Sequence, residues 1–114
     1  MNILSRCLMA LSSGKRMIIK DVTFSNAAAP YTVTLCSSSL QQIVAECINA
    51  GANETGGILI GHYSEDGSTA IVFEATAKPP DSLAGRTTFQ RGTKGLRSLL
   101  QSRWKMGKYY IGEW

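Results

Sequence analysis

The sequence predicts one α+β domain, in which a mixed sheet is flanked by helices. Two kinds of segment support this fold class: short β-branched or apolar runs typical of strands, and runs with apolar residues at helical spacing. Their order is strand, helix, hairpin, helix and strand, without a repeat or a linker. A length of 114 residues with 44% apolar content is enough for one compact core and too short for two ordinary domains.

The first strand and the first helix are predicted between residues 31 and 48. Residues 31–36 alternate and are rich in β-branched side chains, which is typical of a strand. Ser38 with Gln41, or Ser39 with Gln42, has the spacing of a helix capping box. Apolar residues then recur on one helical face for about three turns: Leu40, Ile43, Val44, Cys47 and Ile48.

A hairpin is predicted next. Residues 56–63 are a short apolar run typical of a buried strand, and residues 69–75 form the returning strand. Asp66-Gly67, between the two runs, is a strong signal for a hairpin turn. The two strands should therefore pair antiparallel.

The last third of the chain predicts a loop, a helix and a strand. Residues 78–85 contain Pro79-Pro80 and cannot continue the preceding sheet. Residues 89–104 are predicted as the second helix, and residues 109–114 as a final strand that the C-terminus interrupts. The helical face is apolar at these positions: Leu96, Leu99, Leu100 and Trp104.

Residues 1–30 are predicted as an N-terminal extension of the domain. Residues 1–16 fit a short amphipathic helix or translation from an upstream start, and we favour the second because Met17 would begin the chain sensibly. The three cysteines, at 7, 36 and 47, fit neither a disulfide framework nor a zinc knuckle. With no transmembrane stretch, this cysteine usage predicts a cytoplasmic protein. The sequence predicts no oligomeric state.

Glu54 is the candidate catalytic residue. It precedes a glycine pair that leads into an apolar strand, so its carboxylate should lie at the entrance of the sheet where the backbone approaches closely. A carboxylate placed there can act as a general base, provided that a metal makes a water molecule acidic enough. The alternative is an ordinary exposed glutamate in a loop.

Three segments resemble the JAB/MPN (JAMM) family of zinc metalloproteases and isopeptidases. Residues 54–61 (Glu-Thr-Gly-Gly-Ile-Leu-Ile-Gly) resemble its first catalytic segment. Residues 89–96 (Phe-Gln-Arg-Gly-Thr-Lys-Gly-Leu) and 109–114 (Tyr-Tyr-Ile-Gly-Glu-Trp) resemble a bacterial branch found beside cyclic-nucleotide antiphage (CBASS) systems and on integrative elements. The resemblance covers residues 31–114 and implies the deaminase-like JAB/MPN fold, incomplete at the C-terminus.

The resemblance also implies a zinc site of which this chain holds one part. In the family, two histidines of a His-x-His motif and an aspartate bind zinc, and the residue matching Glu54 deprotonates the zinc-bound water. In the resembling branch, the strand matching residues 109–114 runs directly into His-x-His-Pro. Of these groups only Glu54 is present, and His62, the single histidine, has no recognisable partners. We therefore expect no metal in this chain and no hydrolysis as written.

The intact family implies a hydrolase, namely a deubiquitinase-like isopeptidase acting on a ubiquitin-like or otherwise conjugated protein. The bacterial branch implies antiviral defence, in which the enzyme opposes an E1/E2-like enzyme that conjugates a nucleotide cyclase. Glu113 precedes the ligands in the resembling strand, so Glu113 and Trp114 are weaker candidates for residues that line the cleft or face the substrate.

Two alternatives remain open. One is a non-catalytic MPN-like scaffold, which needs no zinc ligands. The other is a small nucleic-acid-binding protein that uses the basic region 86–108. Residues 79–114 carry seven basic and two acidic side chains together with four aromatic residues: Trp104, Tyr109, Tyr110 and Trp114. We expect these aromatic side chains to pack and not to bind nucleic acid. Trp104 lies on the apolar face of its helix, and alternate residues of the last strand should cover a core.

Overall fold

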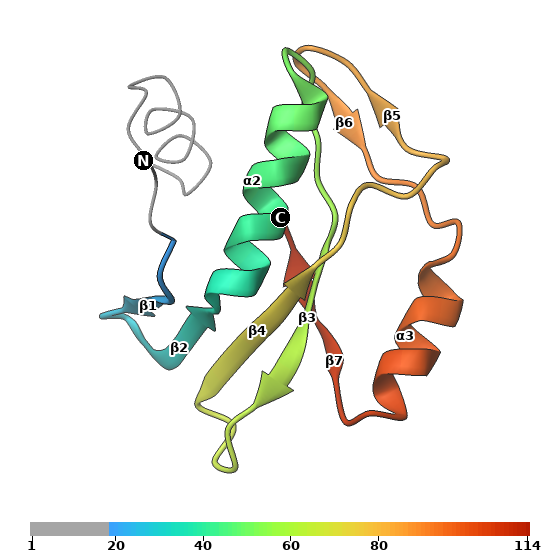
Figure 1. Ribbon diagram of the computed structural model, residues 1–114. Helices are drawn as coiled ribbons and strands as arrows, with labels where there is room; N and C mark the ends of the chain where they lie inside the picture. Colours follow the sequence, from blue (N-terminus) through green and yellow to red (C-terminus); the bar gives the residue numbers. More distant parts are fainter. Residues whose placement is uncertain (1–18) are drawn as a thin grey trace.

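The computed structural model describes residues 19–114, which fold into two sheets and two helices (Figure 1). The order β1-β2-β4-β3-β7 makes up the larger sheet, and β5 pairs with β6 in the smaller one. This arrangement confirms the α+β class with a mixed sheet flanked by helices. The elements are β1 (Val22–Asn26), β2 (Ala29–Leu35), α2 (Ser37–Ala50), β3 (Ile58–Tyr63), β4 (Thr69–Ala75), β5 (Leu83–Ala84), β6 (Phe89–Gln90), α3 (Leu96–Trp104) and β7 (Tyr109–Glu113).

The sheet is mixed because one strand pair is parallel. β2 runs parallel to β4, with α2 and β3 lying between them in the chain, whereas β1–β2, β3–β4 and β3–β7 are antiparallel. The predicted hairpin is thus confirmed as β3 and β4. β7 forms one edge of the sheet, next to β3, and β1 forms the other.

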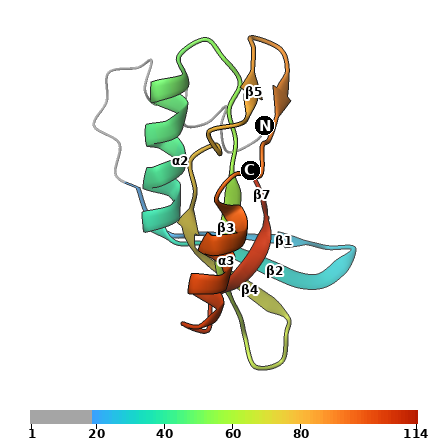
Figure 2. The same cartoon turned by 90° about the vertical axis from the view of Figure 1, so that its right-hand side faces the viewer.

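The core lies between α2 and the central strands. Leu35 of β2, Leu40 of α2 and Val72 of β4 form the buried cluster, and α2 contacts β4. Ile58 and Ile60 of β3 are almost completely buried. α3 contacts β7 instead and lies apart from α2 (Figure 2). The interior strand β3 is therefore well packed at the end where the Glu54 turn enters the sheet.

The start of α2 differs from the predicted capping box. The Ser37 N–H donates to the Asp21 carboxylate at 2.7 Å, so the cap comes from a residue just before β1. The Gln42 Oε1 accepts from the Ala75 N–H at 2.8 Å, and the Ser39 hydroxyl donates to the Cys36 carbonyl. The predicted capping box is wrong because Gln42 binds β4 and the Ser39 hydroxyl binds a carbonyl, so neither side chain caps a helix N–H.

Two further elements differ from the sequence prediction. β1 lies inside the segment predicted as an extension, and it pairs with β2, which begins at Ala29. The second helix begins at Leu96 and not at residue 89, because residues 89–90 form β6 and Gly95 adopts a φ of 85°. The predictions made for residues 1–16 lie outside the described part of the chain.

The β3–β4 turn is fixed by the predicted Asp66-Gly67 pair. The Asp66 carboxylate accepts from the Ser68 N–H and from the hydroxyls of Ser64 and Ser68, and Gly67 has a φ of 71°. These donors, led by the Ser68 amide, lower the pKa of Asp66 to about 2. No helix within residues 19–114 is both long enough and apolar enough to cross a bilayer.

Candidate functional site

The Glu54 turn lies beside the end of β7. Ile58 is paired with Glu113 in the antiparallel β3–β7 ladder. One residue further out, the Gly57 N–H donates to the Trp114 carbonyl at 3.3 Å and the Trp114 N–H donates to the Gly57 carbonyl at 3.1 Å. The two segments that resemble the protease family, far apart in the sequence, therefore meet at one end of the sheet.

The glycine pair allows this close approach. A Cβ at Gly56 would lie within 3.0 Å of the Trp114 carbonyl oxygen and of the Phe89 ring. A Cβ at Gly57 would lie within 3.0 Å of two Thr76 oxygens and the Trp114 indole nitrogen. The expectation that the backbone approaches closely behind Glu54 is confirmed at both positions.

Thr76, just after β4, connects the two sides of the site. Its N–H donates to the Ile58 carbonyl at 2.9 Å, and its hydroxyl oxygen accepts from the Ile58 N–H at 3.0 Å. Its carbonyl oxygen accepts from the Trp114 indole Nε1–H at 3.1 Å. Trp114 is half-buried as a result. β4, β3 and the residue after β7 are thereby held together immediately behind the turn.

Glu54 itself is exposed at the end of the sheet. Its backbone N–H donates to the Gly85 carbonyl at 2.7 Å, which attaches the turn to the β5–β6 hairpin. Figure 1 shows this hairpin at the end of the molecule where α2 connects to β3. Among residues 19–114 the Glu54 carboxylate has no hydrogen bond or ion pair, and its exposure makes it accessible to water.

Glu113 forms an ion pair with Arg91. The Arg91 Nε and Nη2 lie 2.9 Å and 2.7 Å from the same Glu113 oxygen, and the Glu113 side chain is 50% exposed. Arg91 follows β6, so this pair connects β7 to the segment that leads into α3. Unlike the carboxylate of Glu54, that of Glu113 is already engaged by a cation.

The described residues do not fit a catalytic zinc. Within residues 19–114 no group of three or more His, Cys, Asp and Glu side chains could hold a metal ion. His62 stacks on Phe73 at 4.7 Å between ring centroids, which gives it a packing role on the sheet. Because a catalytic zinc needs three protein ligands and an open position, this part of the chain supplies no such centre.

The aromatic residues near the C-terminus are less buried than predicted. Trp104 is 68% exposed, and Tyr109 and Tyr110 are 42% and 47% exposed. Packing of these three side chains was the wrong prediction, because α3 contacts β7 at the edge of the sheet and no described element covers its outer side. Only Trp114 packs as expected, against Gly57 and Thr76.

Sequence reasoning missed Thr76, Gly85 and Arg91. Thr76 and Gly85 act through backbone atoms or one hydroxyl, and such roles leave no recognisable motif. Arg91 was noticed as one of seven basic residues in the last third of the chain and as part of the resembling segment 89–96, but without a role in the site. Its pairing with Glu113 depends on a contact between elements that the sequence does not specify.

Comparison with known proteins gives one clear similarity. No model of a known protein family matches the chain. Over all 114 residues it is 68% identical to a protein of Enterobacter hormaechei subsp. hoffmannii (strain UCI 50) named CD-NTase/cGAS isopeptidase. The chain spans 63% of the length of that relative. This similarity confirms the predicted resemblance to a bacterial isopeptidase.

Proposed function

Because its whole length matches a CD-NTase/cGAS isopeptidase, we propose that the chain is the part of a JAB/MPN isopeptidase domain that carries the general base. The supporting observation is the backbone pairing of Gly57 with Trp114, which brings the Glu54 turn to the end of β7. In the resembling family this strand leads into the metal ligands. The base and the ligands would then meet at one end of the sheet.

The proposed reaction is hydrolysis of an isopeptide bond. Water adds to the carbonyl carbon, the carbon–nitrogen bond breaks, and the products are a carboxylate and a lysine amine. The Glu54 carboxylate would accept a proton from the attacking water and return it to the leaving nitrogen. An exposed carboxylate without a cation partner is suited to this proton transfer, whereas Glu113 is already paired with Arg91.

Residues 19–114 lack the three ligands of a catalytic zinc, so we propose that the 114-residue chain does not hydrolyse its substrate alone. The ligands would lie in the part of the relative that the chain does not span. The intact domain would use zinc, and this chain would hold the remaining half of the active site.

The substrate would be a ubiquitin-like or otherwise conjugated protein attached through its C-terminal carboxyl group. The name of the relative points to a CD-NTase as one of the two linked proteins. We propose that the intact enzyme acts in bacterial antiviral defence, in the cytoplasm, where it would oppose an E1/E2-like conjugating enzyme.

A chimera tests this proposal. The matched region of the Enterobacter protein is replaced by this chain, and the chimera is compared with the 114-residue chain for zinc content and for hydrolysis of an isopeptide-linked CD-NTase conjugate. We expect zinc and activity in the chimera only. Glu54→Gln should lower the activity about 100-fold or more while zinc is retained. Glu65→Gln, an exposed glutamate in the opposite β3–β4 turn, is the matched control.

Two results would refute the proposal: hydrolysis by the 114-residue chain alone, or full activity of the Glu54→Gln chimera. A chimera that binds the conjugate and does not cleave it would favour the non-catalytic scaffold. In that case Glu54 is an ordinary loop residue.

A further inference from the structure

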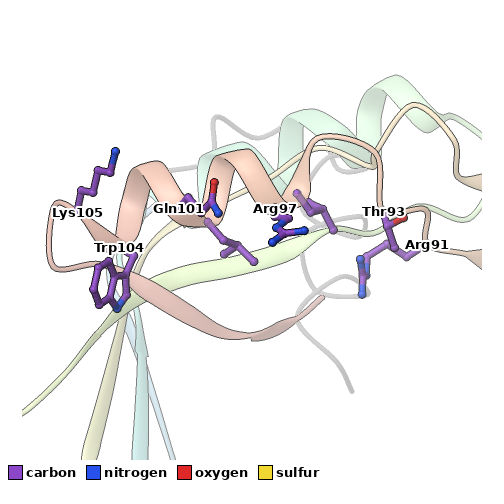
Figure 3. Close-up of a pocket in the computed structure, with 8 residues that line it drawn as sticks. Arg91, Thr93, Arg97, Gln101, Trp104 and Lys105 are labelled. Carbon is purple, nitrogen blue, oxygen red and sulfur yellow. The ribbon is translucent and has the colours of Figure 1, made fainter.

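A groove lies along the outer side of α3 and the segment that leads into it. It is open to solvent with a volume of about 1060 Å³, and its lining includes Arg91, Leu96, Arg97, Leu100, Trp104 and Lys105. Figure 3 shows Trp104 and Lys105 at one end of α3, Arg97 nearer the other, and Arg91 beyond the helix. Glu54 does not line it. The groove is thus a surface separate from the proposed catalytic residue.

The groove carries uncompensated positive charge. Among the described residues, the two ion pairs are Arg91–Glu113 and Arg103–Glu74, so Arg97 and Lys105 have no acidic partner there. The other acid of this region, Asp81, accepts instead from two backbone N–H groups ahead of α3. A ligand entering the groove would therefore meet the cations Arg97 and Lys105.

The same groove presents apolar surface. Leu96 and Leu100, one helical turn apart, are only half-buried, and Trp104 is 68% exposed at the next turn. Figure 3 shows Trp104 and Arg97 on the same side of α3, while Lys105 points to the other side. An apolar stripe bordered by basic side chains is a surface that an acidic, amphipathic protein segment can cover.

We propose that this groove binds an acidic, amphipathic segment of a partner protein. Apolar side chains of the segment would cover Leu96, Leu100 and Trp104, and its carboxylates would pair with Arg97 and Lys105. Charge complementarity favours this occupant over nucleic acid. A nucleic-acid strand carries a phosphate at every nucleotide, whereas the groove offers only two unpaired cations and one exposed indole. Two leucines also offer no flat face on which a base can stack.

Binding is tested with the 114-residue chain and a fluorescein-labelled synthetic peptide of about 15 residues, with leucines at i, i+3 and i+4 spacing and glutamates between them. We expect saturable binding by fluorescence anisotropy. Arg97→Glu combined with Lys105→Glu should weaken it at least tenfold, roughly the effect of losing two charge pairs. Lys20→Glu with Lys78→Glu changes the net charge equally at exposed positions outside the groove and should leave the affinity within about twofold.

Three outcomes would overturn the inference: no saturable binding of the acidic peptide, an equal loss in both charge-reversed pairs, or binding of a matched lysine–leucine peptide. Tighter binding of oligothymidylate, abolished by the groove variants, would identify a nucleic-acid surface and equally refute the acidic segment. Since none of these measurements depends on hydrolysis, their result is independent of the chimera experiment.

Discussion

Gly57 gives the most direct test of how the site is built, because an added methyl group has no space there. In Gly57→Ala the new Cβ would lie within 3.0 Å of the Thr76 carbonyl oxygen, the Thr76 hydroxyl and the Trp114 indole nitrogen. The Thr76 carbonyl cannot rotate away cheaply, since it accepts from the Trp114 Nε1–H while the Thr76 N–H bonds to the Ile58 carbonyl.

The expected cost follows from these contacts. Overpacking at a well-packed position costs about 1–3 kcal/mol. Separating the strands also weakens the hydrogen bonds from Trp114 to Thr76 and from Thr76 to Ile58, each worth about 0.5–1.5 kcal/mol. Gly57→Ala should therefore lower the free energy of unfolding by about 2–6 kcal/mol, a large part of the roughly 5–15 kcal/mol of an ordinary domain.

Urea denaturation followed by circular dichroism measures the loss, because this signal does not depend on the nearby tryptophan. Gly112→Ala is the matched control in β7: nothing lies within 4 Å of its added Cβ, and its free energy of unfolding should change by less than about 1 kcal/mol. If Gly57→Ala were as stable as Gly112→Ala, the close approach of the turn to Thr76 and Trp114 would be wrong.

Three further predictions concern hydrogen bonds. Trp114→Phe keeps an aromatic side chain, smaller than the indole, and removes the donor to the Thr76 carbonyl. The free energy of unfolding in urea should therefore fall by at least about 0.5–1.5 kcal/mol; no change would mean that this bond does not form. The pKa of Asp66 is lowered to about 2, so its carboxylate stabilises the fold above its ordinary pKa of 3.8 and loses that effect as the pH falls toward 2. The Tm difference between wild type and Asp66→Asn should accordingly narrow over this pH range, and a constant difference would contradict the assignment. Asp81→Ala removes the acceptor for the amides of residues 93 and 94, so their hydrogen exchange should become faster while exchange in β4 stays unchanged; equal acceleration in both segments would indicate global destabilisation instead.

The elements predicted correctly are those with a strong local pattern. α2 has apolar residues at helical spacing, and the β3–β4 hairpin has two apolar runs around Asp66-Gly67. β1 was missed although Val22 and Phe24 alternate with polar residues, because the run has five residues and lies in the segment interpreted as an N-terminal extension. Its pairing with β2 depends on the neighbouring strand and not on its own composition.

The start of α3 was missed for a different reason. Residues 89–90 pair with β5, and the side chains of Asp81 and Ser82 bind the backbone of residues 92–94. These contacts come from a loop ten or more residues earlier and hold the segment out of the helix. The helical spacing of apolar residues from residue 96 onward correctly predicted α3, although the apolar face of this helix remains partly exposed.

At the candidate site, sequence reasoning identified the parts and not their connections. Glu54, its two glycines and the Gly-Glu-Trp strand were recognised from their residues and their resemblance to a family. The partners that hold them, Thr76 and Gly85, could not be predicted because they act through backbone groups, which every residue possesses, and through one hydroxyl. The role of Glu54 remains a prediction that the chimera tests.

The β3–β7 pairing has a consequence for the order in which the molecule can be assembled during synthesis. β3 pairs with β4 soon after both are made, but its other edge waits for residues 109–113, which leave the ribosome more than 45 positions after Tyr63. Until then the edge next to the Glu54 turn exposes unpaired backbone groups that can recruit other strands. A nascent chain that pauses between the two segments would therefore be prone to aggregation, and synthesis of β7 both protects this edge and completes the turn.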